Sequence, residues 1–367
     1  VKDILIPENY GSGKLFVSER TNNVDSYKGS NDLFAGYLAI NLPVNSFNIY
    51  AGVRVEHNNM TLTNYKSSVT FDTKDTEYKK TDLFPSVNIS YNLDKNNVLR
   101  AAYGMSVNRP EFREVAPASY YDFDLFNRII GNSDLESAYI HNFDLKYEFY
   151  PSGSELISVA LFYKHFKNPI EWTFINTGGG SRIYTFENAL SANNTGIELD
   201  IKKQLDFVGL KNFSIVFNGS LIDSKVKFGE NSIEEERALQ GQSPFLLNTG
   251  LFYQNDKLQL TAGVMYNVIG KRIVGIGLKN KSENSTIGDD IPDMYEMPRN
   301  VIDFTISKKL GSNFEISFAC KDILAQDMVY KQFPKFDDAD GVRQEREQIT
   351  KKYKVGQNLS ISAKYSF

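Results

Sequence analysis

The chain has 367 residues with 41 basic and 45 acidic side chains, so its formal net charge is −4. This balance argues against nucleic-acid binding, which needs a clustered positive excess. The single cysteine, Cys320, excludes an internal disulfide framework and a cysteine-based zinc site, and the three histidines lack metal-ligand spacing. No apolar run reaches the roughly 18 residues of a membrane-spanning helix. No cofactor is predicted, and the abundance of tyrosine (21) and phenylalanine (26) favours strands over helices.

Taken in chain order, apolar and polar residues alternate in long stretches, which is the pattern of strands with two different faces. In residues 47–56, for example, Phe, Ile, Ala and Val alternate with a set that includes Arg54 and Glu56. Residues 142–149, 197–202 and 314–321 repeat the pattern. We predict about thirteen strands, at residues 32–42, 46–62, 81–93, 97–108, 138–150, 154–170, 190–203, 212–228, 243–254, 257–270, 297–309, 313–324 and 353–367.

The connections between these strands alternate in length. Short turns are expected at 43–45, 94–97, 151–153 and 255–257, and long polar segments at 63–80, 109–137, 171–188, 229–242, 271–296 and 325–352. Outer-membrane barrels are built in this way, whereas a soluble sandwich has strands of about five or six residues. Because a lipid-facing Lys or Arg costs about 2–4 kcal/mol at mid-membrane, basic residues should lie on the polar face. They do so at Arg54, Arg100, Lys146, Lys202 and Lys321.

The fold class predicted is therefore all-β, an antiparallel transmembrane β-barrel. Bacterial single-chain barrels have even strand numbers and short periplasmic turns. The first and last predicted strands both descend toward the short turns, so we expect at least one further strand upstream. We assign residues 1–31 to an extracellular loop and residues 32–367 to the strands, turns and loops of the barrel.

An ordered series of short motifs resembles the TonB-dependent receptors of the Gram-negative outer membrane, in the version common in Bacteroidota. The series covers nearly the whole chain and departs from the family pattern at Ser133, where the family has proline. Its members are Ala51 to Glu56, Asn108 to Glu114, Gly131 to Leu135, Glu187 to Ala189, Gly196 to Leu199, Gln242 to Phe245, Asn248, Tyr253, Tyr295 to Arg299, Asp303 and the terminal Phe367.

The resemblance implies the C-terminal part of a plugged barrel of about 22 strands, with the plug absent. It implies active import of a scarce nutrient such as a siderophore, a cofactor or an oligomeric nutrient. The implied partners are the TonB-ExbB-ExbD complex, reached through the missing plug, the outer-membrane assembly machinery and the lipid bilayer. The alternative is a passive channel of about 14 strands, with a strand added from Lys14 to Glu19. A barrel enzyme, which lacks support because no Gly-x-Ser-x-Gly elbow occurs, and a soluble binding sandwich are further readings.

Candidate ligand contacts lie in two long segments. Aromatic residues interleaved with arginines suit stacking and charge-assisted hydrogen bonds to a polar ligand, with loop packing as the competing explanation. These candidates are Arg109, Phe112, Arg113, Tyr120, Tyr121, Arg128, Trp172 and Tyr184, the last two flanking Gly178 to Gly180. Tyr365 and Phe367 end the last strand, which resembles the signal read by the assembly machinery. The acidic runs Glu234 to Glu236 and Asp337 to Asp340 lack calcium-loop spacing, so solvated loop charge is expected there.

Overall fold

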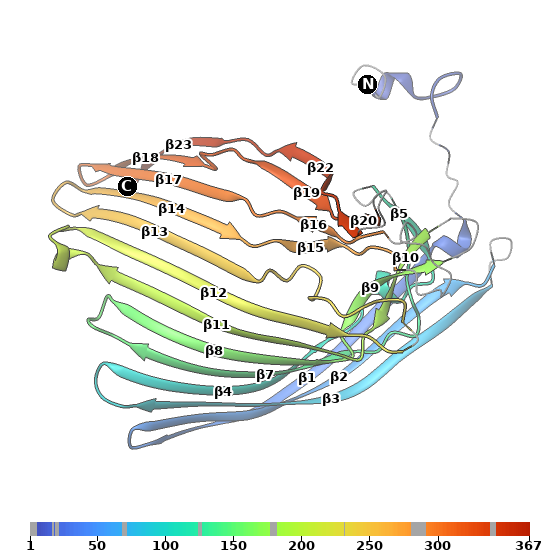
Figure 1. The fold of residues 1–367 in the computed structure, drawn as a ribbon, viewed down its shortest axis with the longest axis horizontal. Coiled ribbons are helices and arrows are strands. Elements are labelled where there is room, and N and C mark those ends of the chain that lie inside the picture. The colour runs from blue at the N-terminus through green and yellow to red at the C-terminus, as the bar shows by residue number, and fades with distance from the viewer. Residues whose placement is uncertain are drawn as a thin grey trace.

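The structure is a computed structural model that describes residues 6–16, 18, 22–67, 72–123, 127–176, 182–230, 232–279, 291–337 and 343–367. A 13-stranded antiparallel sheet dominates it (Figure 1). The strands, in sheet order, are β1 (Tyr27–Val44), β2 (Phe47–Tyr65), β3 (Thr73–Asn92), β4 (Asn97–Asn108), β7 (Ala138–Phe149), β8 (Leu156–Lys167), β11 (Ser191–Gln204), β12 (Phe213–Lys227), β13 (Phe245–Asn255), β14 (Leu260–Ile269), β17 (Asn300–Leu310), β18 (Phe314–Lys321) and β23 (Asn358–Tyr365). The thirteen strands predicted from alternation are confirmed.

Short turns join the strands at one end of the sheet and long connections join them at the other (Figure 1). The tightest turn, between β1 and β2, places Asn45 at φ 54°. Asparagine tolerates this left-handed conformation better than most residues because its short side chain bonds the local backbone. Gly311 adopts φ 71° in the turn between β17 and β18, where a Cβ would be strained. The turn chemistry thus fixes the register of both hairpins.

The register carries one apolar face across the strands, which we call the outer face. In β7, β8, β11 and β12 it aligns Leu145, Leu161, Ile197 and Leu221 in a row. Leu161 is 51% exposed and Leu221 is 63% exposed. A continuous apolar surface left open to the surroundings is what a membrane-spanning sheet presents to lipid.

The opposite, inner face carries ionic and amide groups on the same strands. Arg100 Nε lies 2.8 Å from Glu148 Oε2, and Lys146 Nζ lies 3.5 Å from Glu148 Oε1 and 3.9 Å from Asp200 Oδ2. Asn218 donates a further hydrogen bond to Asp200. The alternation therefore predicted correctly that the sheet has one apolar face and one polar face; we call this two-faced sheet the wall.

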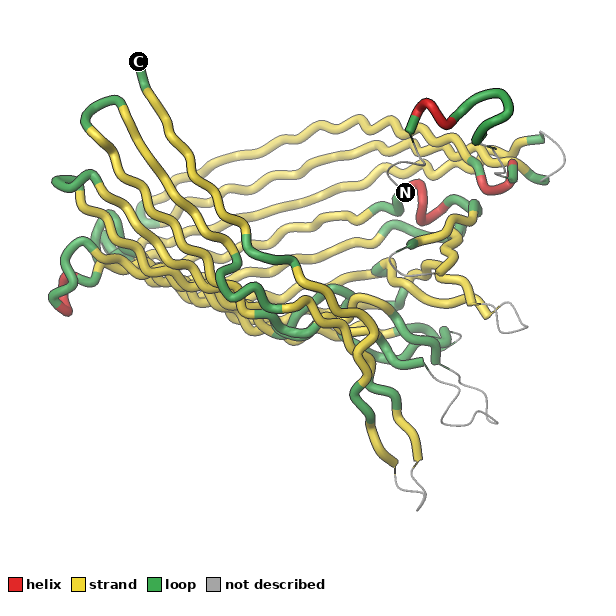
Figure 2. The backbone as a smooth tube through the Cα atoms, turned by 90° about the horizontal axis from the view of Figure 1, so that it is seen from above, coloured by secondary structure: helices red, strands yellow, loops and turns green. Residues whose placement is uncertain are grey.

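The sheet curves into a trough (Figure 2). Among the described residues, its edge strands β1 and β23 each pair on one side only. β1 begins at Tyr27, earlier than predicted, and residues Lys14 to Glu19, considered for an additional strand, lie partly outside the described residues. Helices are short turns: α1 (Phe112–Val115), η1 (Pro7–Asn9), η2 (Asn23–Asp25) and η3 (Asp206–Val208). In the described ranges none of the helices has the length and apolar character needed to cross a membrane.

The long connections hold strands of their own, which the sequence analysis treated as loops. One four-stranded sheet has the order β5 (Ser119–Asp122), β6 (Asn127–Ile130), β10 (Arg182–Asn188) and β9 (Ile170–Asn176). A second has the order β15 (Arg272–Gly275), β16 (Met294–Glu296), β19 (Asp327–Gln332) and β22 (Gln348–Lys354), and β20 (Lys335–Asp337) pairs with β21 (Arg343–Glu345). No strands were predicted at these positions. Some of these strands pair within one connection, as β9 and β10 do, and others pair between connections, as β6 and β10 do.

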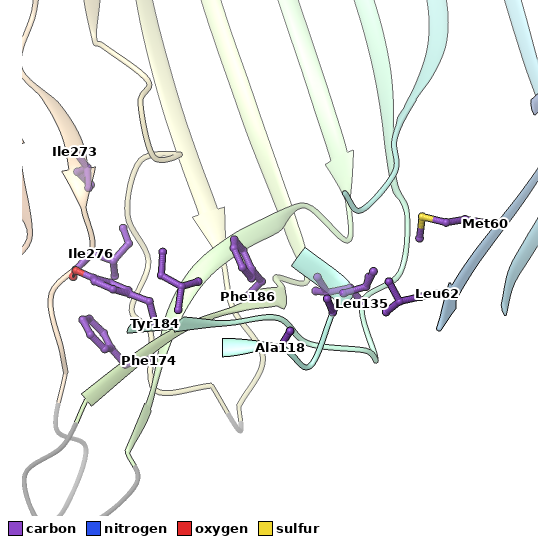
Figure 3. Close-up of a cluster of buried hydrophobic side chains, with 12 residues drawn as sticks. Met60, Leu62, Ala118, Leu135, Phe174, Tyr184, Phe186, Ile273 and Ile276 are labelled. Carbon is purple, nitrogen blue, oxygen red and sulfur yellow. Dashed lines mark hydrogen bonds between the residues drawn. The ribbon is translucent and has the colours of Figure 1, made fainter. Parts of the chain in front are cut away.

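The main hydrophobic core lies among these loop-end elements (Figure 3). Met60 and Leu62 contribute to it from the inner face of β2, and Ile273 contributes from β15. Val115 of α1 and Ile129 of β6 are fully buried between them. The loops therefore fold over the inner, concave side of the sheet and form a cap at one end of the trough.

Candidate functional site at the loop end of the sheet

Arg109 follows β4 and bridges two other strands. Its guanidinium donates to Glu56 Oε2 of β2 at 2.8 Å and to Asp82 Oδ2 of β3 at 3.0 Å. Tyr139 of β7 donates to the other oxygen of Asp82 at 2.6 Å. The backbone pairing of β3 with β4 begins only at Ser86. The side-chain bonds of Arg109 and Tyr139 therefore join β3 to the neighbouring strands beyond the end of that pairing. Arg109, a predicted ligand candidate, is thus engaged within the wall.

The motif Gly131 to Leu135 packs against α1. The Gly131 N–H donates to Ala116 O at 3.0 Å, and a Cβ at this glycine would meet that oxygen at 2.3 Å. Asn132 Nδ2 then donates to Phe186 O of β10 at 2.9 Å. The glycine permits the close approach, and the asparagine joins the first long connection to the second.

Asn188 makes a second junction between the same two connections. Its Nδ2 donates to Glu136 O at 3.0 Å and to Asn168 O at 2.9 Å, and its Oδ1 accepts from the Glu136 N–H at 2.8 Å. An amide side chain can donate and accept at once, so it satisfies two separate pieces of backbone. The Glu187 to Ala189 motif therefore has a structural role at this site.

Trp172 and Tyr184 belong to a packed aromatic cluster on β9 and β10. The Trp172 ring lies 5.6 Å from Tyr184 and 4.6 Å from Phe186, and Phe174 lies 4.1 Å from Tyr184, measured between centroids. Tyr184 is buried and donates to Ile276 O at 3.0 Å. Burial raises the pKa of Tyr184 to about 12, so the phenol remains a donor. Gly178 to Gly180 lie outside the described residues.

A buried ionic cluster joins β9 to the segment 228–244 (the Arg237 segment). Arg237 Nη1 donates to Glu171 Oε2 at 2.6 Å, and Arg237 Nε lies 3.7 Å from Glu234 Oε2. Thr173 donates to Glu234 Oε1 at 3.0 Å. The three charged side chains are only 7%, 6% and 1% exposed, respectively. The expectation that Glu234 is solvated loop charge was wrong, because its side chain is buried against Thr173 and Arg237.

Burial sets the protonation of this cluster. Desolvation raises the pKa of Glu234 to about 7, opposed by the Arg237 charge and the Thr173 hydrogen bond. Burial also raises the pKa of Glu171, again opposed by Arg237. One guanidinium thus compensates two desolvated carboxylates, and a buried charge without compensation is costly.

A cavity of about 450 Å³ opens beside this cluster, between the end of β12 and the elements β15 and β16. Its lining is strongly charged and includes Glu234, Arg237, Lys271, Arg272, Lys279 and Asp293. Lys271 Nζ lies 4.6 Å from the centroid of Tyr295, and Arg272 Nη2 lies 2.9 Å from Glu296 Oε2. Sequence reasoning missed this cavity because its walls come from segments far apart in the chain. The described residues contain no cluster of potential metal ligands.

Three of the predicted candidates are exposed on the loop-end surface. The Arg113 guanidinium lies 5.2 Å from the centroid of Tyr120, Tyr121 is 47% exposed, and the exposed Arg128 donates to Ser119 Oγ. Phe112 is half-buried, with its ring against Gly29 of β1. Burial raises the pKa of Tyr120.

Tyr365 and Phe367, the predicted assembly signal, lie at the opposite end of the sheet from these loop residues. Their rings are 5.3 Å apart in an edge-to-face arrangement, and both are exposed.

Comparison with known proteins agrees with this architecture. No curated protein matches the chain in sequence. The ferric-catecholate import receptor Fiu of Escherichia coli K12 superposes with a TM-score of 0.61 at 13% identity, covering 93% of this chain and 45% of Fiu. The ferric yersiniabactin uptake receptor FyuA of Yersinia pestis gives 0.60 at 13% identity, covering 93% and 46%. The siderophore receptor PiuA of Acinetobacter baumannii gives 0.61 at 12%, covering 92% and 44%.

These likenesses concern the fold, and the chain spans about half the length of each receptor. Residues 8–352 match the model of the outer membrane protein beta-barrel family. Together with the two-faced sheet, this match places the chain in the outer membrane, and the chain belongs to the outer membrane protein beta-barrel family.

Proposed function

We propose that the chain is the C-terminal barrel wall of a TonB-dependent import receptor, completed by a plug and earlier strands of a barrel of about 22 strands. The observation that carries this proposal is the cap of loop-end elements folded over the polar concave face. A cap that narrows a wide lumen suits a protein that captures cargo before moving it, whereas an open channel needs free passage. The similarity to import and uptake receptors supports the same reading.

The proposed cargo is a siderophore or a comparable scarce nutrient. The similar structures include receptors named for ferric catecholate, ferric yersiniabactin and siderophores. Arg113, Tyr121 and Arg128 offer exposed guanidinium and phenol groups on the loop-end surface, and such groups suit a polar or anionic ligand. Phe112, Trp172 and Tyr184 would shape the site from within the cap, and Arg109 would do so from the end of the sheet. Tyr120 would support Arg113 through its ring.

Energy-dependent uptake by the full-length receptor tests the proposal. Cells that lack the gene would be complemented with it and offered iron as single purified siderophores, with and without a functional TonB-ExbB-ExbD complex. We expect growth on at least one siderophore, lost when the complex is absent. Uptake of small solutes of every charge, unchanged when the complex is absent, would instead establish the passive channel of about 14 strands.

Loop variants locate the contacts. The double variant Arg113→Gln and Arg128→Gln should weaken cargo binding at least about tenfold, because charge-assisted hydrogen bonds contribute about 1.5–3 kcal/mol each. The matched control, Lys95→Gln with Lys211→Gln, removes the same charge from exposed short-turn positions. Equal binding by both double variants would show that Arg113 and Arg128 do not contact the cargo. The proposal of import would be unaffected by that result.

A further inference from the structure

On the outer face the residue type changes in ordered rows from the apolar band toward the loop end. The register of β7, β8, β11 and β12 defines these rows. After the aliphatic row come, in turn, Phe143, Tyr163, Thr195 and Asp223; then His141, His165, Asn193 and Lys225; then Tyr139, Lys167, Ser191 and Lys227. Aromatic residues thus follow the aliphatic row on β7 and β8, where β11 and β12 carry Thr195 and Asp223, and lysines enter in the two rows beyond. On a membrane protein, aromatic and then cationic residues follow the apolar band toward the headgroups.

All three histidines of the chain occupy equivalent positions in this pattern. His57 of β2 follows Val55 on the outer face, His141 of β7 precedes Phe143, and His165 of β8 follows Tyr163. Each is the first residue of the outer face beyond the apolar run of its strand. The histidines therefore mark where the hydrocarbon boundary lies on three strands. Lys225 lies in the row of His141 and His165, and Lys167 and Lys227 lie one row beyond it.

Hydrogen bonds within the wall orient the two neighbouring imidazoles. Tyr103 Oη lies 3.0 Å from His141 Nδ1, and His165 Nδ1 lies 2.8 Å from Asn193 Oδ1. The two ring centroids are 6.4 Å apart. In the described part of the chain, neither Nε2 has a hydrogen-bond partner. The imidazoles are thus held by Nδ1, and both side chains are partly exposed.

Three exposed lysines complete this patch, which we call the outer rim patch: His141, His165, Asn193, Lys167, Lys225 and Lys227. Lys167 and Lys227 are separated by the single strand β11, a spacing of about 10 Å that two flexible ammonium groups can close. Within the described ranges neither forms an ion pair, whereas Lys225 pairs with Glu236 at 2.5 Å. Asp223 and Glu236 reduce the positive charge of the patch.

We propose that the outer rim patch binds a phosphorylated lipid headgroup in the outer leaflet of the membrane. The patch continues the lipid-facing surface, so a lipid whose chains lie against the apolar rows presents its headgroup at the lysines. Cationic side chains at this depth attract anionic headgroups. Lys167 and Lys227 would bind the phosphate oxygens, and the imidazoles and Asn193 would contact the adjoining polar groups. This binding site is independent of the cargo proposed above.

Native mass spectrometry tests the proposal: the full-length receptor is mixed with lipid in detergent, and the detergent is then removed in the gas phase. The probe is phosphatidic acid. Two controls accompany it: diacylglycerol with the same acyl chains, which lacks the phosphate, and inorganic phosphate, which lacks the chains. We expect the wild type to retain phosphatidic acid in preference to both. The triple variant Lys167→Gln, Lys225→Gln and Lys227→Gln should bind it at least about tenfold more weakly, because each lysine contributes roughly a fivefold preference.

Two further variants make the result decisive. Lys95→Gln, Lys211→Gln and Lys257→Gln together remove the same charge at the short-turn end and should retain the wild-type affinity. Glu236→Gln releases Lys225 from its ion pair and should tighten binding. Heat-modifiable migration confirms that each variant is folded. Equal affinity of the two triple variants, or retention of inorganic phosphate alone as tightly as the lipid, would overturn the proposal.

Discussion

Replacing Arg237 by methionine should detach the Arg237 segment from the cap while leaving the sheet intact. The guanidinium compensates the carboxylates of Glu171 and Glu234, and all three side chains are nearly excluded from solvent. Removing one partner of a buried ion pair costs about 3–5 kcal/mol, since the remaining charge stays desolvated. At a pH high enough to ionise both, the two carboxylates would be left without that compensation.

Amide hydrogen exchange in lipid nanodiscs measures this loss directly. A loss of about 3–5 kcal/mol corresponds to local opening that is roughly a hundred to several thousand times more frequent. The faster exchange should be confined to β9 and the Arg237 segment, since β12 keeps its sheet ladder. Adding Glu171→Gln and Glu234→Gln to the Arg237 variant should restore protection. Unchanged exchange in the single variant would refute the view that the guanidinium holds this segment.

The control is another ion pair of the same segment. Lys225 and Glu236 are 52% and 48% exposed, and solvent-exposed pairs contribute about 1 kcal/mol or less. Glu236→Gln should therefore change exchange in the Arg237 segment by less than about tenfold.

Three other outcomes are expected. Burial raises the pKa of Glu234 from 4.5 to about 7, so its contribution to the folded state is complete below pH 4.5 and is lost as the pH rises through about 7. Protection of the Arg237 segment should therefore fall over this interval. Glu234→Gln should reduce the fall, and the remainder belongs to Glu171, whose pKa burial also raises. Arg109→Met should expose the connection 109–137 to proteolysis, since Glu56 and Asp82 are buried; a wild-type cleavage pattern would argue against the bridge. Deleting Phe367 from the full-length protein should lower the yield of heat-modifiable barrel, and an unchanged yield would reject the assembly-signal hypothesis.

The large sheet was predictable because its physical requirement repeats at every second residue. Each strand must put apolar side chains toward lipid, so the alternation in 142–149 alone identifies β7 and its two faces. The tight turn at Asn45 is equally local. The ends of the strands were less predictable. Residues 27–31 of β1 are mostly polar and pair with β2 on the loop side of the apolar band. Apolar and polar residues do not alternate there, so the sequence pattern does not identify these residues as strand.

The cap was less predictable because its contacts join distant segments. Arg109 was expected to face a ligand, yet its partners Glu56 and Asp82 lie 53 and 27 residues away. Glu234 belongs to an acidic run that reads as solvent-facing charge, and its burial depends on Thr173 and Arg237. β5 and β6 have four residues each, too few for alternation to distinguish them from loop. Packing across segments, rather than local pattern, decides all of these positions.

The central claim is that the wall has a lipid side and a water side, and spin labels along β7 test it most directly. Single cysteines would replace residues 143 to 148 in turn, in a Cys320→Ser background, in the full-length receptor reconstituted in bilayers. We predict that labels at Phe143, Leu145 and Tyr147 collide with dissolved oxygen, and that labels at Asp144, Lys146 and Glu148 collide with a water-soluble nickel chelate. The reverse assignment, or no alternation along the strand, would contradict the account.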